Sequence, residues 1–111
     1  MSINFEWLEQ FRADERYQKI ARLLALYFNY EFYESAIRDL RDAIEHPTVA
    51  ADWEHVVATV HSRSLRPNQA LYLVNHEANK AIDENSDEEA YNWLDLMIAN
   101  VTRADGEIAP Y

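Results

Sequence analysis

The chain has 111 residues, 49% of them hydrophobic, which suffices for one hydrophobic core and is atypical of a disordered polypeptide. It has no cysteine, which excludes disulfide bonds and thiolate metal ligands. Twenty acidic against ten basic residues give a net charge of −10, which disfavours binding to nucleic acid and to anionic lipid headgroups.

Turn-forming residues are sparse along the chain. Glycine occurs once, at Gly106, and there are three prolines, whereas a β-rich fold of this size needs many more turns. The apolar residues recur at helical spacing throughout. The sequence therefore predicts a single all-α domain over residues 1–111, a compact bundle of about five helices.

The first two predicted helices cover residues 3–13 and 15–45. The first carries Trp7, Leu8 and Phe11 on one face. The second contains the aromatic stretch LALYFNYEFY at 24–33, where the apolar stripe changes side near Asn29–Glu31. Its first stripe is Ile20, Leu23, Leu24, Tyr27 and Phe28, and its second is Tyr30, Tyr33, Ile37, Leu40 and Ile44.

A bend at the change of stripe, or a central helix wrapped by others, would account for this pattern. Either arrangement places most of the rings in the core, and we expect Tyr27 and Tyr30 to be buried there. Phe28 and Phe32 are explained least by the second stripe, and the sequence leaves open whether they belong to the core or to an interface.

Three further helices are predicted over 49–62, 67–83 and 87–104, the first after Pro47 and the second with Pro67 in its first turn. The last has the clearest start, with Ser86 as N-cap and Glu89 as its capping-box partner. The apolar stripe of this helix is Ala90, Trp93, Leu94, Met97, Ile98 and Val101.

No pattern of catalytic, cofactor-binding or metal-binding residues emerges. His76-Glu77 begins like a zinc-protease motif, but Lys80 stands where the second histidine belongs. Asp52 and His55 form one imperfect match to a di-iron ligand pair, and we expect His55 to be a solvated residue and His61 a boundary one. The expectation is a protein that is not an enzyme and carries no cofactor.

Residues 81–102 contain six acidic residues and no basic one. Helix capping explains two or three of the acids, and solubility is the plain alternative for the rest. Apolar residues on polar helix faces beside such carboxylates are also typical of protein interfaces. The predicted partner-binding residues are Asp83, Glu84, Asp87, Glu88, Tyr91, Asp95, Tyr72 and His76. We expect Glu88 and Asp95 to be solvated charges.

A small, acidic, cysteine-free helical chain with tyrosines beside carboxylates resembles bacterial immunity proteins of nuclease toxins, of the colicin or contact-dependent-inhibition type. The string AIEHP at Ala43–Pro47, followed by Asp52, is similar to a segment of the helical colicin-DNase immunity proteins. The tyrosine-pair-proline motif of that family is absent, so the resemblance carries over no binding residue. It implies a stoichiometric inhibitor whose partner is a basic nuclease domain.

Two other classes remain open: a helical adaptor or regulatory module, and a small hydrolase or ligand-binding bundle. No apolar run approaches the roughly 20 residues that span a bilayer, and the N-terminus lacks the features of a signal peptide. A cytoplasmic location without membrane partners is therefore expected, and the oligomeric state is left open.

Overall fold

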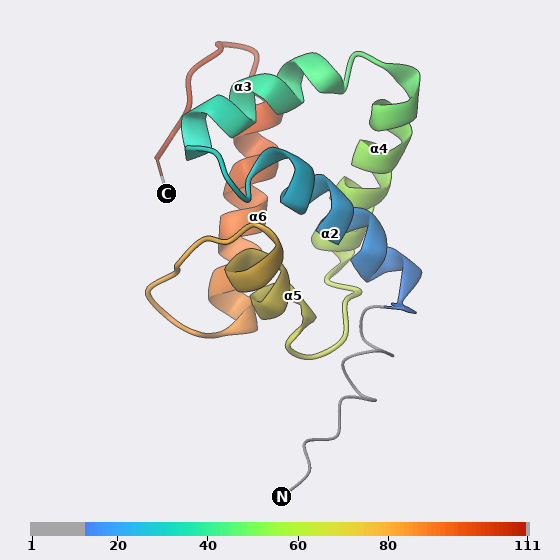
Figure 1. Ribbon diagram of the computed structural model, residues 1–111, viewed down its shortest axis with the longest axis vertical. Helices are drawn as coiled ribbons and strands as arrows, with labels where there is room; N and C mark the ends of the chain where they lie inside the picture. The colour runs from blue at the N-terminus through green and yellow to red at the C-terminus, as the bar shows by residue number, and fades with distance from the viewer. Residues whose placement is uncertain (1–12, 111) are drawn as a thin grey trace, which may run out of the picture.

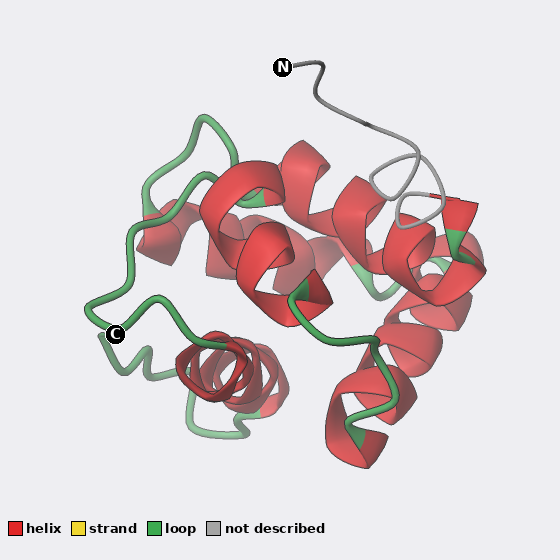
Figure 2. Ribbon diagram, turned by 90° about the horizontal axis from the view of Figure 1, so that it is seen from below, coloured by secondary structure: helices red, strands yellow, loops and turns green. Residues whose placement is uncertain are grey.

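The chain folds as a set of helices joined by short turns and loops (Figure 1). The computed structural model describes residues 13–110, so nearly all of the predicted helix over 3–13 lies outside the described residues. The elements are α2 Glu15–Tyr27, α3 Tyr33–Ala43, α4 Pro47–Ser62, α5 Gln69–Tyr72, the π-helix η1 Leu73–Glu77 and α6 Asp87–Thr102. Residues 13–110 contain no strand (Figure 2), and the predicted all-α class is confirmed.

The segment predicted as one bent helix over 15–45 is two helices. α2 begins after Asp14, whose Oδ1 accepts a hydrogen bond from the Arg16 N–H at 3.0 Å. It ends at Tyr27, and α3 starts at Tyr33 after five non-helical residues. The bend predicted near Asn29–Glu31 is thus a full break in the helix.

The core lies where α6 meets α3, α4 and α5, while α2 packs against α4 and η1. All six residues of the apolar stripe predicted for α6 are buried, which confirms that stripe. From α4 the core receives Trp53, Val56 and Val60. One cluster of buried apolar side chains includes residues from every one of these elements.

The helix predicted over 67–83 is much shorter than expected. Its start is delayed because Asn68 has a left-handed backbone, with φ of 71°, and α5 begins only at Gln69. Its last turn widens into η1, where the Ala78 N–H donates to the Leu73 carbonyl at 2.9 Å. A second left-handed residue, Asn79 with φ of 55°, then ends helical structure.

Candidate protein-binding surface

The turn between α2 and α3, residues 28–32, contains both a core ring and two of the most exposed rings. We call it the aromatic turn. Phe28 is fully buried, with its ring edge-on to Trp93 at 5.3 Å between centroids. Tyr30 is 95% exposed and Phe32 is 85% exposed. The prediction that Tyr30 lies in the core is wrong, because the helical wheel does not continue through the break.

Side-chain hydrogen bonds clamp the aromatic turn to the end of η1 and the residues after it. Asn29 Nδ2 donates to the carbonyl of Glu77 at 2.9 Å and lies 3.5 Å from that of His76. Lys80 Nζ donates to the Glu31 carbonyl at 2.7 Å. Asn79 Nδ2 donates to the Asn29 carbonyl at 3.4 Å. The two exposed rings therefore project from a backbone that is held at several points.

The loop over residues 78–86, which joins η1 to α6, lies beside the aromatic turn (Figure 1). We call it the acidic loop. Asp83 and Glu84 are exposed on it, and Glu88 is exposed in the first turn of α6. Within residues 13–110 the carboxylates of these three residues make no hydrogen bond or ion pair. They are the predicted binding residues that stay available to a partner.

A groove of about 560 Å³ opens beside the contact between the aromatic turn and the acidic loop. Tyr33 and Trp93 lie beneath it, and Phe32, Ala81 and Pro110 form its sides. The Tyr33 and Trp93 rings are 5.7 Å apart and meet edge to face. Burial raises the pKa of the Tyr33 hydroxyl, and the hydrogen bond from Asn100 only partly opposes that shift.

The segment that carries Pro110 is tied down by two residues of the helices beneath it. Asn100 is fully buried, and its side chain binds both backbone groups of Ala109: Oδ1 accepts the N–H at 2.8 Å, and Nδ2 donates to the carbonyl at 2.9 Å. Arg41 donates to the carbonyls of Gly106 and Glu107 at 2.9 and 2.8 Å. These bonds fix one side of the groove. Neither residue stands out in the sequence, because an asparagine and an arginine at these positions look like ordinary polar helix residues.

Three of the predicted binding residues, Asp87, Asp95 and Tyr91, contact other parts of the fold instead. Asp87 accepts backbone N–H groups of Asn68 and Leu71 at 2.6 and 3.0 Å, which caps the start of α5. Asp95 forms a two-point ion pair with Arg63, with contacts of 2.6 and 3.0 Å. Asp95, expected to be a solvated charge, is still 38% exposed, but a base outside the acidic segment neutralises it.

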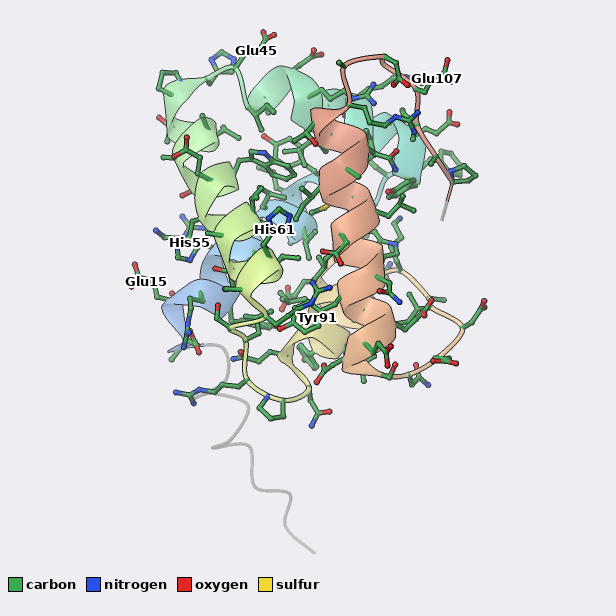
Figure 3. The ribbon with its side chains drawn as sticks, turned by 180° about the vertical axis from the view of Figure 1, so that it is seen from behind. Glu15, Glu45, His55, His61, Tyr91 and Glu107 are labelled. Carbon is green, nitrogen blue, oxygen red and sulfur yellow. The ribbon has the colours of Figure 1, made fainter. Side chains whose placement is uncertain are left out.

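Tyr91 belongs to the same contact (Figure 3). The Arg63 guanidinium lies 4.4 Å from the centre of its ring. The tyrosine is half-buried against the core. The pKa of its hydroxyl is raised above the ordinary value, first by burial and then by the negative charge of Asp87. A hydrogen bond with the Leu65 backbone only partly opposes this shift. Tyr91 thus acts as a packing residue between α6 and the segment after α4.

Tyr72 and His76, the remaining predicted binding residues, stack on each other with ring centres 4.1 Å apart. Tyr72 is half-buried against the core, while His76 is exposed. The carbonyl of His76 faces Asn29 of the aromatic turn. His76 therefore flanks the clamped turn, whereas much of the Tyr72 ring is covered.

The histidines of α4 differ from expectation as well. His55, predicted to be solvated, is half-buried, and its Nε2 is buried without a hydrogen bond from the described residues. His61, labelled in Figure 3 near the end of α4 and predicted at a boundary, is exposed. Within residues 13–110, no group of three or more His, Cys, Asp or Glu side chains could hold a metal ion.

Comparison of the chain with known protein families, with curated proteins and with solved structures gives no match. None of the helices among residues 13–110 is long and apolar enough to cross a membrane. Function must therefore be argued from the aromatic turn, the groove and the surrounding charges.

Proposed function

We propose that the protein is a stoichiometric inhibitor that binds a basic partner, and that this partner is a bacterial nuclease toxin which it neutralises in the cytoplasm. The observation that carries the proposal is the clamped aromatic turn, where Tyr30 and Phe32 are almost fully exposed beside the carboxylates of the acidic loop. Exposed aromatic anchors within a charged rim are typical of the residues that dominate binding energy at interfaces.

Charge supports the choice of partner. A nuclease must present a basic surface to the phosphates of its substrate. A protein with a net charge of −10 is attracted to such a surface, and the attraction accelerates association. Rings held at the end of a rigid turn then slow dissociation, because little side-chain and backbone freedom remains to be lost on binding.

The experiment places a photoreactive benzoylphenylalanine at position 30, which is exposed, and in a control variant at position 58 on α4, which is also exposed. Irradiation of the native cells followed by mass spectrometry should identify a basic protein joined at position 30 and absent from the control. Purified protein should then abolish the nuclease activity of that partner at a one-to-one ratio.

A captured partner whose nuclease activity persists, or which has none, would favour the second candidate, a helical adaptor without a link to toxins. The same clamped turn supports that candidate, since an anchor surface serves any protein partner. Capture of an acidic or neutral protein would contradict the inhibitor proposal, which requires a basic partner.

A further inference from the structure

We propose that the groove between the aromatic turn and the acidic loop binds an extended basic segment of the partner, with one apolar side chain of that segment seated over Tyr33 and Trp93. The inference rests on the proposed function and deepens it, because it names the kind of segment that the partner would place in the groove. The Tyr30 ring reaches outward, whereas the Phe32 ring also lines the groove, and the groove receives a side chain of the partner.

The interior of the groove favours an apolar occupant. Two aromatic rings lie beneath it, and a phenylalanine, an alanine and a proline form its sides. It is an open depression of about 560 Å³, which suits one side chain of a segment that runs across the surface. Removing such a surface from water is favourable in rough proportion to its apolar area.

The polar groups at the rim argue against a small polar ligand. Such a ligand needs a few convergent donors and acceptors to fix its orientation. Of the two charged residues that line the groove, Lys80 is bound to the Glu31 carbonyl at 2.7 Å. Glu34 lies 3.6 Å from Arg38 in an exposed pair, so its carboxylate stays accessible, but one carboxylate is no convergent set of donors and acceptors. Apolar contact and the surrounding charge are what remain for recognition.

That surrounding charge is negative. Glu31 and Glu34 are exposed on the aromatic-turn side, and Asp83 and Glu84 are exposed on the acidic loop. Lys80 is the one basic residue within the aromatic turn and the acidic loop, and its ammonium group is bound to the turn. An apolar residue flanked by lysine or arginine therefore fits the groove and its margins better than one flanked by acids.

The groove is also held in shape on both sides. Asn29 and Lys80 fix the aromatic turn, while Asn100 and Arg41 fix the segment that ends in Pro110. A site that is formed before binding loses less conformational freedom when a ligand arrives.

The test is a titration of the isotope-labelled full chain with short peptides, followed through the indole N–H signals of its tryptophans. The probe is acetyl-Lys-Lys-Leu-Lys-Lys-amide. One control peptide has glycine in place of leucine, and another has glutamate in place of every lysine. Trp93 lines the groove and Trp53 on α4 serves as the internal reference.

We expect the leucine peptide to move the Trp93 signal saturably and to leave Trp53 in place. The glycine peptide should bind about tenfold more weakly, because it lacks the side chain that would be buried. The glutamate peptide should produce no saturable shift. Equal binding of all three peptides, or no saturable shift at Trp93 with the leucine peptide, would overturn the proposal.

Matched variants locate the effect. Ala81→Trp fills the groove from an exposed loop position and should abolish the Trp93 shift, whereas Ala58→Trp on α4 should not. Glu34→Lys should weaken binding of the leucine peptide severalfold, and Glu54→Lys on α4 should leave it unchanged. Loss of binding in the α4 variants to the same extent would overturn the assignment to the groove.

The experiments distinguish failure of the groove assignment from failure of the proposed inhibitor role. If Ala81→Trp still neutralises a captured nuclease with full affinity, the inhibitor role stands and the groove assignment fails. If the leucine peptide binds as expected but no basic protein is captured at position 30, the groove stands and the inhibitor role fails.

Discussion

Phe28 and Tyr30 show how strongly the position of a single aromatic residue depends on where a helix ends. Phe28 follows the last turn of α2 and still points into the core, where its ring meets Trp93 and Tyr33. Tyr30 is two residues further on, in a turn whose backbone is held against η1 and the acidic loop by the bonds from Asn29 and Lys80, and its ring is 95% exposed. The aromatic turn thus contributes one ring to the hydrophobic core and another to the exposed surface.

Truncating these two rings should have very different effects on stability. Phe28→Ala should lower the free energy of unfolding by about 3–5 kcal/mol, because it leaves a cavity in the core. Tyr30→Ala should change it by less than about 0.5 kcal/mol, because the ring is in solvent. Urea unfolding followed by circular dichroism measures both. A large loss in the Tyr30 variant would mean that the ring is covered.

Asp14 is the carboxyl whose environment most clearly links stability to pH. Its side chain is only 7% exposed, and Arg16 and Arg66 lie 3.5 and 3.6 Å from its oxygens. Burial raises the pKa of Asp14, but the Arg16 hydrogen bond and the two positive charges outweigh burial, so the pKa falls below its ordinary value.

A carboxyl with a lowered pKa in the folded state adds stability above its unfolded pKa of about 3.9, and this stability is lost as the pH falls through the folded pKa. Asp14→Asn keeps a capping side chain but no titrating group. It should therefore lose less stability than the parent between about pH 5 and pH 2. Urea midpoints across that range measure the difference, and parallel losses in both proteins would contradict it.

At the scale of elements, the start of α6 is set by residues next to it in sequence. Ser86 Oγ accepts the Glu89 N–H at 3.2 Å, as the capping pattern predicts. The three acidic residues of the first turn, Asp87, Glu88 and Glu89, suit the positive end of the helix dipole. Asp87 also caps α5 across the loop.

Ser86→Ala should lower the free energy of unfolding by about 0.5–2 kcal/mol, because a backbone N–H of the first turn loses its acceptor. Asn85→Ala, at an exposed residue one position earlier, is the matched control and should change it by less than about 0.5 kcal/mol. Chemical denaturation of the two variants measures the contrast. Equal effects would place the cap elsewhere.

The elements that the sequence predicts well are those governed by local chemistry. The cap at Ser86 and the apolar stripe of α6 are of this kind, since both depend on residues within a few positions. The break at the aromatic turn and the early end of η1 are not. At the aromatic turn, bonds from Asn29 to Glu77 and from Lys80 to Glu31 join distant parts of the chain, and η1 is followed by Asn79, whose left-handed backbone the helical pattern does not show.

The surface charge of the whole molecule also depends on contacts between residues that are distant in sequence. The acidic segment 81–102 has no base within it, yet Asp95 is paired with Arg63, which ends α4. Asp87 is used within the fold, whereas Asp83, Glu84 and Glu88 remain exposed. The sequence therefore shows that the protein is acidic, but only the tertiary contacts separate carboxylates that stabilise the fold from carboxylates that stay exposed.

We propose above that the exposed rings of the aromatic turn anchor a basic partner. The most direct measurement is surface plasmon resonance of the partner captured at position 30 with the variant Tyr30→Ala/Phe32→Ala. Its matched control is Leu26→Ala, which truncates an exposed apolar residue of α2 outside the turn.

The double variant should dissociate at least about thirtyfold faster at a nearly unchanged association rate, as expected for the loss of an interface anchor. Leu26→Ala should dissociate at the parental rate. A parental dissociation rate for the double variant would show that the two rings contribute nothing to holding the partner, and the proposed anchor role would be wrong.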